Sequence, residues 1–139
     1  LITGAGGVFG KMLQNSGIAD QISSIMTAGN LSLFLPFAMA FALKSAQGSS
    51  TVALVTTASI MVPLMPALGL DTEIMRVLTV LATGAGAIAV SHANDSFFWA
   101  MTQLSGMNIK QGYQSHSLGT VILSFTAMAI IFILATVLA

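Results

Sequence analysis

Long apolar runs separated by short polar clusters dominate the pattern of this chain. The main runs cover residues 31–43, 52–68, 74–90 and 118–139. As a helix, the first run is about 20 Å long and falls short of a hydrocarbon core of roughly 30 Å, whereas the last run is long enough to cross it. The pattern predicts an all-α integral membrane protein with a final transmembrane helix at residues 118–139.

The polar cluster between the first two runs reads S-A-Q-G-S-S-T at residues 45–51. Two short apolar arms around a polar, glycine-containing tip predict a re-entrant helical hairpin at residues 31–68. Two tilted spanning helices joined by an aqueous loop explain the same residues equally well. Lys44 ends the first run, and we expect its long stem to carry the charge towards the lipid headgroups.

A second polar cluster, S-H-A-N-D-S at residues 91–96, stops the third apolar run just before an aromatic segment. It predicts a discontinuous helix at residues 74–107. Asp71 or Thr72 is suited to cap the start of this helix. The G-A-G-A sequence at residues 84–87 offers a face small enough for another helix to approach closely.

The remaining segments are predicted to lie at the membrane surface or at a helix end. Residues 108–117 are polar and are predicted to form a loop at the interface, and residues 1–10 fit the end of a membrane helix. Residues 11–30 are amphipathic, as in a helix that lies along the interface. Because the chain starts inside an apolar run without an initiator Met, we expect it to be the C-terminal part of a longer protein.

Composition narrows the class of function. Hydrophobic residues make up 55% of the chain and charged residues 6%, and the mean hydropathy is +0.92. The formal net charge is +0, so there is no basic surface to bind nucleic acid. Without cysteine and with 2 histidines, disulfides, thiolate metal sites and zinc clusters are excluded. We expect no cofactor and no metal.

Two enzymatic interpretations fit the residues poorly. The glycine-rich start has Phe9 where a dinucleotide-binding motif needs its last glycine, and no strand precedes it. Ser91, His92 and Asp95 are the residue types of a hydrolase triad, but they lie close together in the sequence and no oxyanion hole accompanies them. The chain is therefore not expected to be an enzyme.

The two polar breaks indicate a solute site. Non-helical backbone inside a membrane is tolerated only where protein or a water-filled cavity covers it. A helix starts after each break, and helix N-termini direct their positive dipole ends towards anionic groups. We expect the substrate to be bound by Gln47, Gly48, Ser49, Ser50, Thr51, Asn94 and Ser96.

Asp95 and His92 are candidates for carrying or sensing a coupled proton. A carboxylate at a membrane break is costly to bury unless it is paired or protonated, and a histidine can titrate near neutral pH. Simpler interpretations stay open: Asp95 and the hydroxyls of residues 49–51 are suited to cap helices. The imidazole of His92 is equally well explained as a neutral ring bound to a carbonyl.

Three motifs resemble the C-terminal part of the gluconate permease family. They are I-T-G-A-G-G-V-F-G-K-M-L-Q-N-S-G-I at residues 2–18, A-Q-G-S-S-T-V-A-L at residues 46–54, and G-A-I-A-V-S-H-A-N-D-S-F-F-W at residues 86–99. The resemblance implies a multi-pass, proton-coupled importer of gluconate or a related sugar acid in a bacterial inner membrane. It places the family in the ion transporter superfamily.

That superfamily is built from two inverted repeats, each with a re-entrant hairpin and a discontinuous helix. The resemblance implies that residues 31–68 are the hairpin of the second repeat and residues 74–107 its discontinuous helix. The expected partners are the sugar acid, protons, the lipid bilayer and the N-terminal part that carries the other repeat, and a homo-oligomer is compatible with the sequence. Transport of another hydroxy acid or an ion, and a non-transporting assembly module, are the alternatives.

Overall fold

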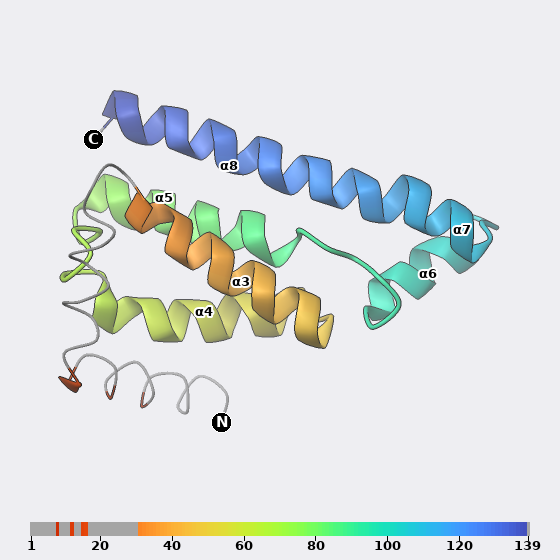
Figure 1. Ribbon diagram of the computed structural model, residues 1–139, viewed down its shortest axis with the longest axis horizontal. Helices are drawn as coiled ribbons and strands as arrows, with labels where there is room; N and C mark the ends of the chain where they lie inside the picture. The colour runs from red at the N-terminus through yellow and green to blue at the C-terminus, as the bar shows by residue number, and fades with distance from the viewer. Residues whose placement is uncertain (1–7, 9–11, 13–14, 17–30, 139) are drawn as a thin grey trace.

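The computed structural model (Figure 1) describes residues 31–138 and, before them, residues 8, 12, 15 and 16. The helix end and interfacial helix predicted at residues 1–30 lie almost wholly outside the described residues. The described part is helical and contains no strand, which confirms the all-α prediction. Its elements are η1 (Leu31–Leu33), α3 (Phe34–Gln47), α4 (Ser50–Leu64), α5 (Glu73–Ala87), α6 (Ser96–Leu104), α7 (Ile109–Gly112), the π-helix η2 (Tyr113–Ser117) and α8 (Leu118–Leu138).

Helices α3 and α4 form a tight hairpin (Figure 1). They have 14 and 15 residues, so each is about 21–23 Å long. Only Gly48 and Ser49 separate them. The predicted seven-residue tip is therefore too long, because residues 45–47 form the last turn of α3. Gly48 takes a φ of 74°, and the side chain of Ser49 caps α4 by accepting a hydrogen bond from the backbone N–H of Val52 at 3.3 Å.

Helix α5 lies at the centre of the packing and contacts α3, α4 and α8. Thr72 caps its start, as predicted, by accepting a hydrogen bond from Met75 N at 3.3 Å. The small-residue face is confirmed at Gly86: a Cβ added there would lie 2.3 Å from the carbonyl oxygen of Phe37 in α3. On another side, the Ser124 hydroxyl of α8 donates to the carbonyl of Ala85 at 2.7 Å.

The chain between α5 and α6 is non-helical from Ile88 to Asp95. The break therefore begins earlier than the predicted residues 91–96, because the helix ends directly after the close-packed glycine and alanine residues. The side chain of Asp95 caps α6 by accepting a hydrogen bond from Phe97 N at 3.0 Å. Figure 1 shows this segment leading away from the α3–α5 bundle towards α6.

The loop predicted at residues 108–117 is wrong. Residues Ile109–Leu138 form one helical run of 30 residues, which is the one helix in the described part that is long and apolar enough to cross a membrane. A capping box starts it: Asn108 Oδ1 accepts from Gln111 N, and Gln111 Oε1 accepts from Asn108 N, both at 2.9 Å. The polar residues Tyr113–Ser117 form a π-helical turn within this run.

The apolar core joins the hairpin, α5 and the C-terminal half of α8. Figure 1 shows α8 running along the length of the molecule, with α5 and α3 between its C-terminal half and α4. The buried residues of this core are Leu33, Phe37, Ile60, Met61, Leu64, Leu68, Leu70, Leu78, Ala82, Ala85, Met128, Ile131 and Ala135.

Candidate functional site

A buried ion pair joins the hairpin to the break after α5. Lys44 Nζ lies 2.6 Å from Asp95 Oδ2, and the two residues are 2% and 4% exposed. The expectation that Lys44 extends towards the headgroups is wrong. Helix α3 continues to Gln47, so Lys44 lies inside its last turn, where Asp95 supplies the opposite charge that a buried ammonium requires.

Hydrogen bonds occupy the remaining positions around this pair. Asp95 Oδ2 also accepts from the Ser91 hydroxyl at 2.7 Å, while Oδ1 accepts from Phe97 N as the cap of α6. Lys44 Nζ donates a second bond to the carbonyl of Gly48 at 3.0 Å. Both breaks are thus tied to one ion pair, and each charge has at least one neutral partner besides the opposite charge.

The π-helix η2 extends this network. His116 Nε2 lies 3.0 Å from Ser91 Oγ, and the Ser117 hydroxyl donates to the Ser91 carbonyl. A π-helical turn within an α-helix is frequently found at functional sites. Hydrogen bonds from His116 to Ser91 and from Ser91 to Asp95 thus connect the π-helix to the ion pair.

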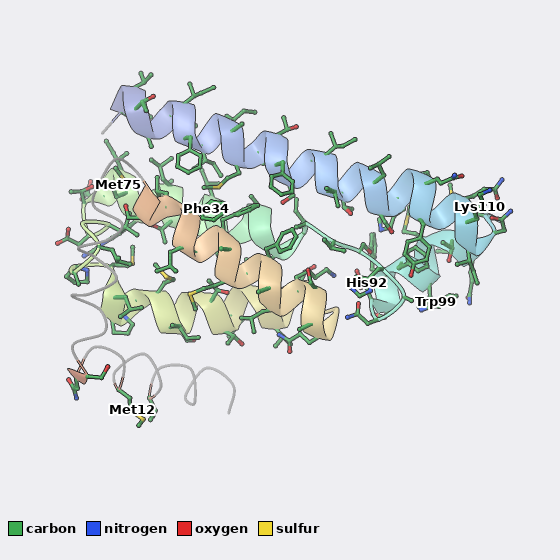
Figure 2. The ribbon with its side chains drawn as sticks, in the orientation of Figure 1. Met12, Phe34, Met75, His92, Trp99 and Lys110 are labelled. Carbon is green, nitrogen blue, oxygen red and sulfur yellow. The ribbon has the colours of Figure 1, made fainter. Side chains whose placement is uncertain are left out.

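Side chains of the break after α5 also cap the C-terminal end of α3. His92 Nε2 lies 3.0 Å from the carbonyl oxygen of Ser45, and Asn94 Nδ2 donates to the carbonyls of Ser45 and Ala46 at 3.0 and 3.3 Å. Figure 2 shows His92 beside the end of α3. These side chains satisfy helix carbonyls that have no partner within α3.

Gly48 is the point of closest backbone approach between the two breaks. A Cβ at this position would lie 2.2 Å from the carbonyl oxygen of Asn94. Its φ of 74° is also one that residues with a side chain rarely adopt. Glycine is therefore required here by both contact and conformation.

A cleft of about 360 Å³ opens beside the ion pair. The first residue of α4, Ser50, borders it, as does Phe97 at the start of α6. The starts of α4 and α6 and the Lys44–Asp95 ion pair therefore surround one space, and the negative charge of Asp95 balances the positive charge of Lys44 there. The cleft is lined by Lys44, Ser50, Ile88, Ser91, Asp95, Phe97, His116, Thr120 and Leu123.

The predicted substrate residues occupy different positions around this cleft. Ser50 borders it, Ser49 caps α4 and Gly48 is buried against Asn94. The remaining four are exposed side chains at the surface of the described part of the chain and do not line the cleft; they are Gln47, Thr51, Asn94 and Ser96.

Lys44 and His116 are site residues that the sequence reasoning missed. The signal for Lys44 was present: a lysine within an apolar membrane segment is functional or paired by default. The sequence signal for His116 was weaker, because its segment has the composition of a surface loop.

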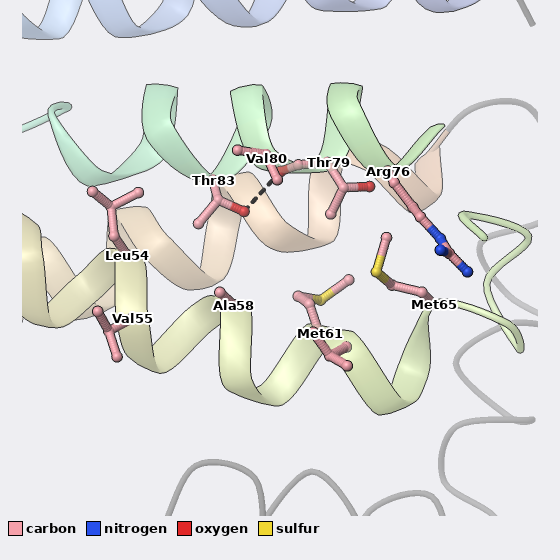
Figure 3. A pocket seen from close by; sticks show the side chains of 10 residues that line it. Leu54, Val55, Ala58, Met61, Met65, Arg76, Thr79, Val80 and Thr83 are labelled. Atoms are coloured by element: carbon pink, nitrogen blue, oxygen red, sulfur yellow. Dashed lines mark hydrogen bonds between the residues drawn. The ribbon is translucent and has the colours of Figure 1, made fainter. Parts of the chain in front are cut away.

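A second cleft lies between α4 and α5 and has different walls (Figure 3). Its volume is also about 360 Å³, but aliphatic and methionine side chains dominate its lining. Thr83 and Thr79 contribute hydroxyls there, and the Thr83 hydroxyl is already bonded to the Thr79 carbonyl at 2.8 Å. Arg76 is the one charged residue among the described residues of this lining, and they include no ion pair like that of Lys44 and Asp95.

Within the described residues, no group of three or more His, Asp or Glu is placed to hold a metal ion. The acid of the site, Asp95, is instead bound to an ammonium, a hydroxyl and a backbone N–H.

Comparisons with known proteins agree with the sequence motifs. The profile of the family described as GntP family permease matches residues 1–137. The inner membrane permease YgbN of Escherichia coli is 39% identical over 132 residues, 94% of this chain and 28% of that protein. The gluconate permease of Pseudomonas aeruginosa is 37% identical over 139 residues, 99% of this chain and 30% of that protein.

The D-serine transporter DsdX of Escherichia coli is 32% identical over 139 residues, 99% of this chain and 31% of that protein. The chain thus spans less than a third of the length of these curated relatives. No solved structure matches it. The relatives are permeases and transporters, not enzymes, in agreement with the prediction from sequence. The resemblance to the gluconate permeases is confirmed, and the chain belongs to the GntP permease family.

Proposed function

We propose that this chain is one part of a longer, multi-pass transporter that carries gluconate or a related sugar acid across a bacterial inner membrane, together with protons. The single observation that supports it most is the cleft where the two breaks meet, which is bordered by the buried Lys44–Asp95 ion pair and by the starts of α4 and α6. A substrate carboxylate fits beside Lys44 when Asp95 is protonated, and the hydroxyl of Ser50 fits a polyol.

The predicted site residues keep their roles in this proposal. Ser50 is the predicted contact that borders the cleft. Gln47, Gly48, Ser49, Thr51, Asn94 and Ser96 contribute when the rest of the transporter and the substrate are in place. Asp95 carries the coupled proton, and His92 senses it from the neighbouring turn.

The proposal also places the elements in the membrane. The hairpin of α3 and α4 is re-entrant, because two arms of about 21–23 Å do not cross a core of roughly 30 Å. Helices α5 and α6 are the two halves of a discontinuous helix. An inverted repeat from the remainder of the transporter faces them and completes the substrate site.

A second candidate substrate is a small amino acid such as D-serine. The named D-serine transporter among the relatives supports it, and so does the ion pair, because a zwitterion presents a carboxylate to Lys44 and an ammonium to Asp95. A sugar acid lacks the ammonium. The two substrates therefore differ in their need for a charged Asp95.

Uptake of radiolabelled gluconate by vesicles that contain the complete transporter tests the proposal. We expect gluconate to accumulate, unlabelled sugar acids to compete better than D-serine, and an uncoupler to abolish accumulation. Accumulation that persists with the uncoupler would rule out proton coupling. Stronger competition by D-serine than by any sugar acid would favour the second substrate.

A further inference from the structure

The buried ion pair beside the cleft is electrically neutral as it stands. Lys44 Nζ and Asp95 Oδ2 are 2.6 Å apart, and both residues are nearly inaccessible although they border the cleft. Breaking such a pair by removing one charge costs much more than keeping it, because the other charge remains buried without compensation. The site therefore stays neutral only if a proton and an anion enter it together.

We propose that Lys44 is the residue that binds the substrate carboxylate, and that it is released for this role when Asp95 takes up the coupled proton. This rests on the proposed function as a sugar acid and proton symporter. In the empty site the ammonium of Lys44 balances the carboxylate of Asp95. In the loaded site Asp95 is a neutral acid, and the ammonium balances the carboxylate of the substrate.

Charge balance explains why the two ligands load together. A proton alone on Asp95 leaves one uncompensated positive charge on Lys44, and a substrate carboxylate alone adds one uncompensated negative charge. Either half-loaded state is penalised in a buried site. Because coupling between two binding events is reciprocal, the proton strengthens substrate binding as much as the substrate strengthens proton binding.

The structure supplies a proton route to Asp95. His116 Nε2 lies 3.0 Å from Ser91 Oγ, which lies 2.7 Å from Asp95 Oδ2. A protonated His116 passes its proton to Ser91 Oγ while the proton of that hydroxyl moves to Asp95 Oδ2. The step leaves a neutral imidazole, an intact serine and a neutral carboxylic acid, so atoms and charge balance.

Few other ionisable groups face Asp95 in the described residues. Lys44 reaches it from α3, and His116 reaches it from η2 through Ser91. His92 lies in the same break but is directed at the Ser45 carbonyl. The walls contributed by α4 and α8 are Ser50, Thr120 and Leu123, none of which titrates in the range of interest. Proton uptake on substrate binding is therefore assigned to Asp95.

The test uses the purified complete transporter, radiolabelled gluconate and a pH indicator in weak buffer. In the wild type, each gluconate bound takes up about one proton, and the affinity falls about tenfold per pH unit on the alkaline side. Asp95→Asn resembles the protonated acid, so it binds gluconate with an affinity that no longer depends on pH and without proton uptake. Lys44→Met binds at least tenfold more weakly.

Two exposed charged residues provide matched controls. Lys110→Met and Asp71→Asn remove a lysine and an aspartate that lie away from the cleft. Both are expected to bind gluconate and take up protons as the wild type does. The double variant Lys44→Met/Asp95→Asn keeps the site neutral, so it folds even where a single variant does not, and it is expected to lose gluconate binding.

The outcomes separate this inference from the function on which it rests. A wild type that does not bind gluconate, or that binds it without proton uptake, overturns the proposed symport and the inference with it. A wild type that is proton-coupled, together with an Asp95→Asn variant that still takes up a proton per gluconate, overturns the inference alone. A double variant that binds gluconate with wild-type affinity also overturns the inference alone.

Discussion

At the scale of single residues, the site depends on a lysine and an aspartate that are 51 positions apart in the chain. Each would be costly to bury alone, and together with Ser91 and the Gly48 carbonyl they form a satisfied network. The sequence marked Asp95 as functional by its place in a break. It did not reveal the partner, because pairing across 51 residues is decided by how α3 packs against the break.

Lys44→Met should destabilise the protein by about 3–5 kcal/mol, because it leaves the carboxylate of Asp95 buried without an opposite charge. Denaturant unfolding in detergent measures the change in the free energy of unfolding. Lys110→Met, at an exposed position, should change it by about 0.5 kcal/mol or less. Adding Asp95→Asn to Lys44→Met should recover part of the loss, and a purely additive double variant would contradict a direct interaction between the two side chains.

Gly48→Ala tests the contact between the two breaks, and Gly69→Ala is its matched control. Both glycines have positive φ, 74° and 68°, so both variants pay roughly 1–2 kcal/mol for conformation. Only at Gly48 does the new methyl group meet Asn94, at 2.2 Å from its carbonyl oxygen, whereas nothing lies within 4 Å at Gly69.

We therefore expect Gly48→Ala to be the more destabilising of the two and to reduce gluconate uptake strongly, while Gly69→Ala keeps most of the uptake. Thermal unfolding and vesicle uptake measure the two effects. Equal loss of stability and uptake in both variants would show that the hairpin tip and the break do not touch as described.

At the scale of elements, apolar periodicity predicted helices well and their ends poorly. The apolar runs became α3, α4, α5 and α8, and Thr72 capped α5 as expected. Polar composition predicts a loop at residues 45–47 and 108–117, but residues 45–47 and 109–117 are helical. Both stretches contact another segment, through the backbone carbonyls of Ser45 and Ala46 in one and through the His116 side chain in the other. Local sequence does not encode which segment that is.

Gly86→Ala and Gly84→Ala separate packing from helix propensity in α5. A Cβ at Gly86 would lie 2.3 Å from the Phe37 carbonyl oxygen and 2.9 Å from Ala40 Cβ, so α3 and α5 would have to move apart. The expected loss is about 1–3 kcal/mol of unfolding free energy. At Gly84 nothing lies within 4 Å, and alanine there should be neutral or stabilising by up to about 1 kcal/mol. Equal destabilisation by the two variants in denaturant unfolding would contradict the close packing of α3 on α5.

At the scale of the whole molecule, the long helical run Ile109–Leu138 joins an apolar bundle to a polar site. Its C-terminal half packs against α5, and its π-helical turn supplies His116 and Ser117 to the break. The family was predictable from three motifs, and two of these, at residues 46–54 and 86–99, contain the breaks. The residues that line the cleft were not predictable from these motifs, because Lys44 and His116 lie outside them and reach the cleft only through tertiary packing.

The most direct test of the central claim, that the sugar acid binds in the cleft between the two breaks, is alkylation of a cysteine at Ser50. This chain has no cysteine, so Ser50→Cys can be placed in a complete transporter whose other cysteines have been removed, with Asp71→Cys in the exposed turn as the control. Saturating gluconate should slow the alkylation of Ser50→Cys several-fold and leave that of Asp71→Cys unchanged. Equal rates of Ser50→Cys alkylation with and without gluconate would contradict the account.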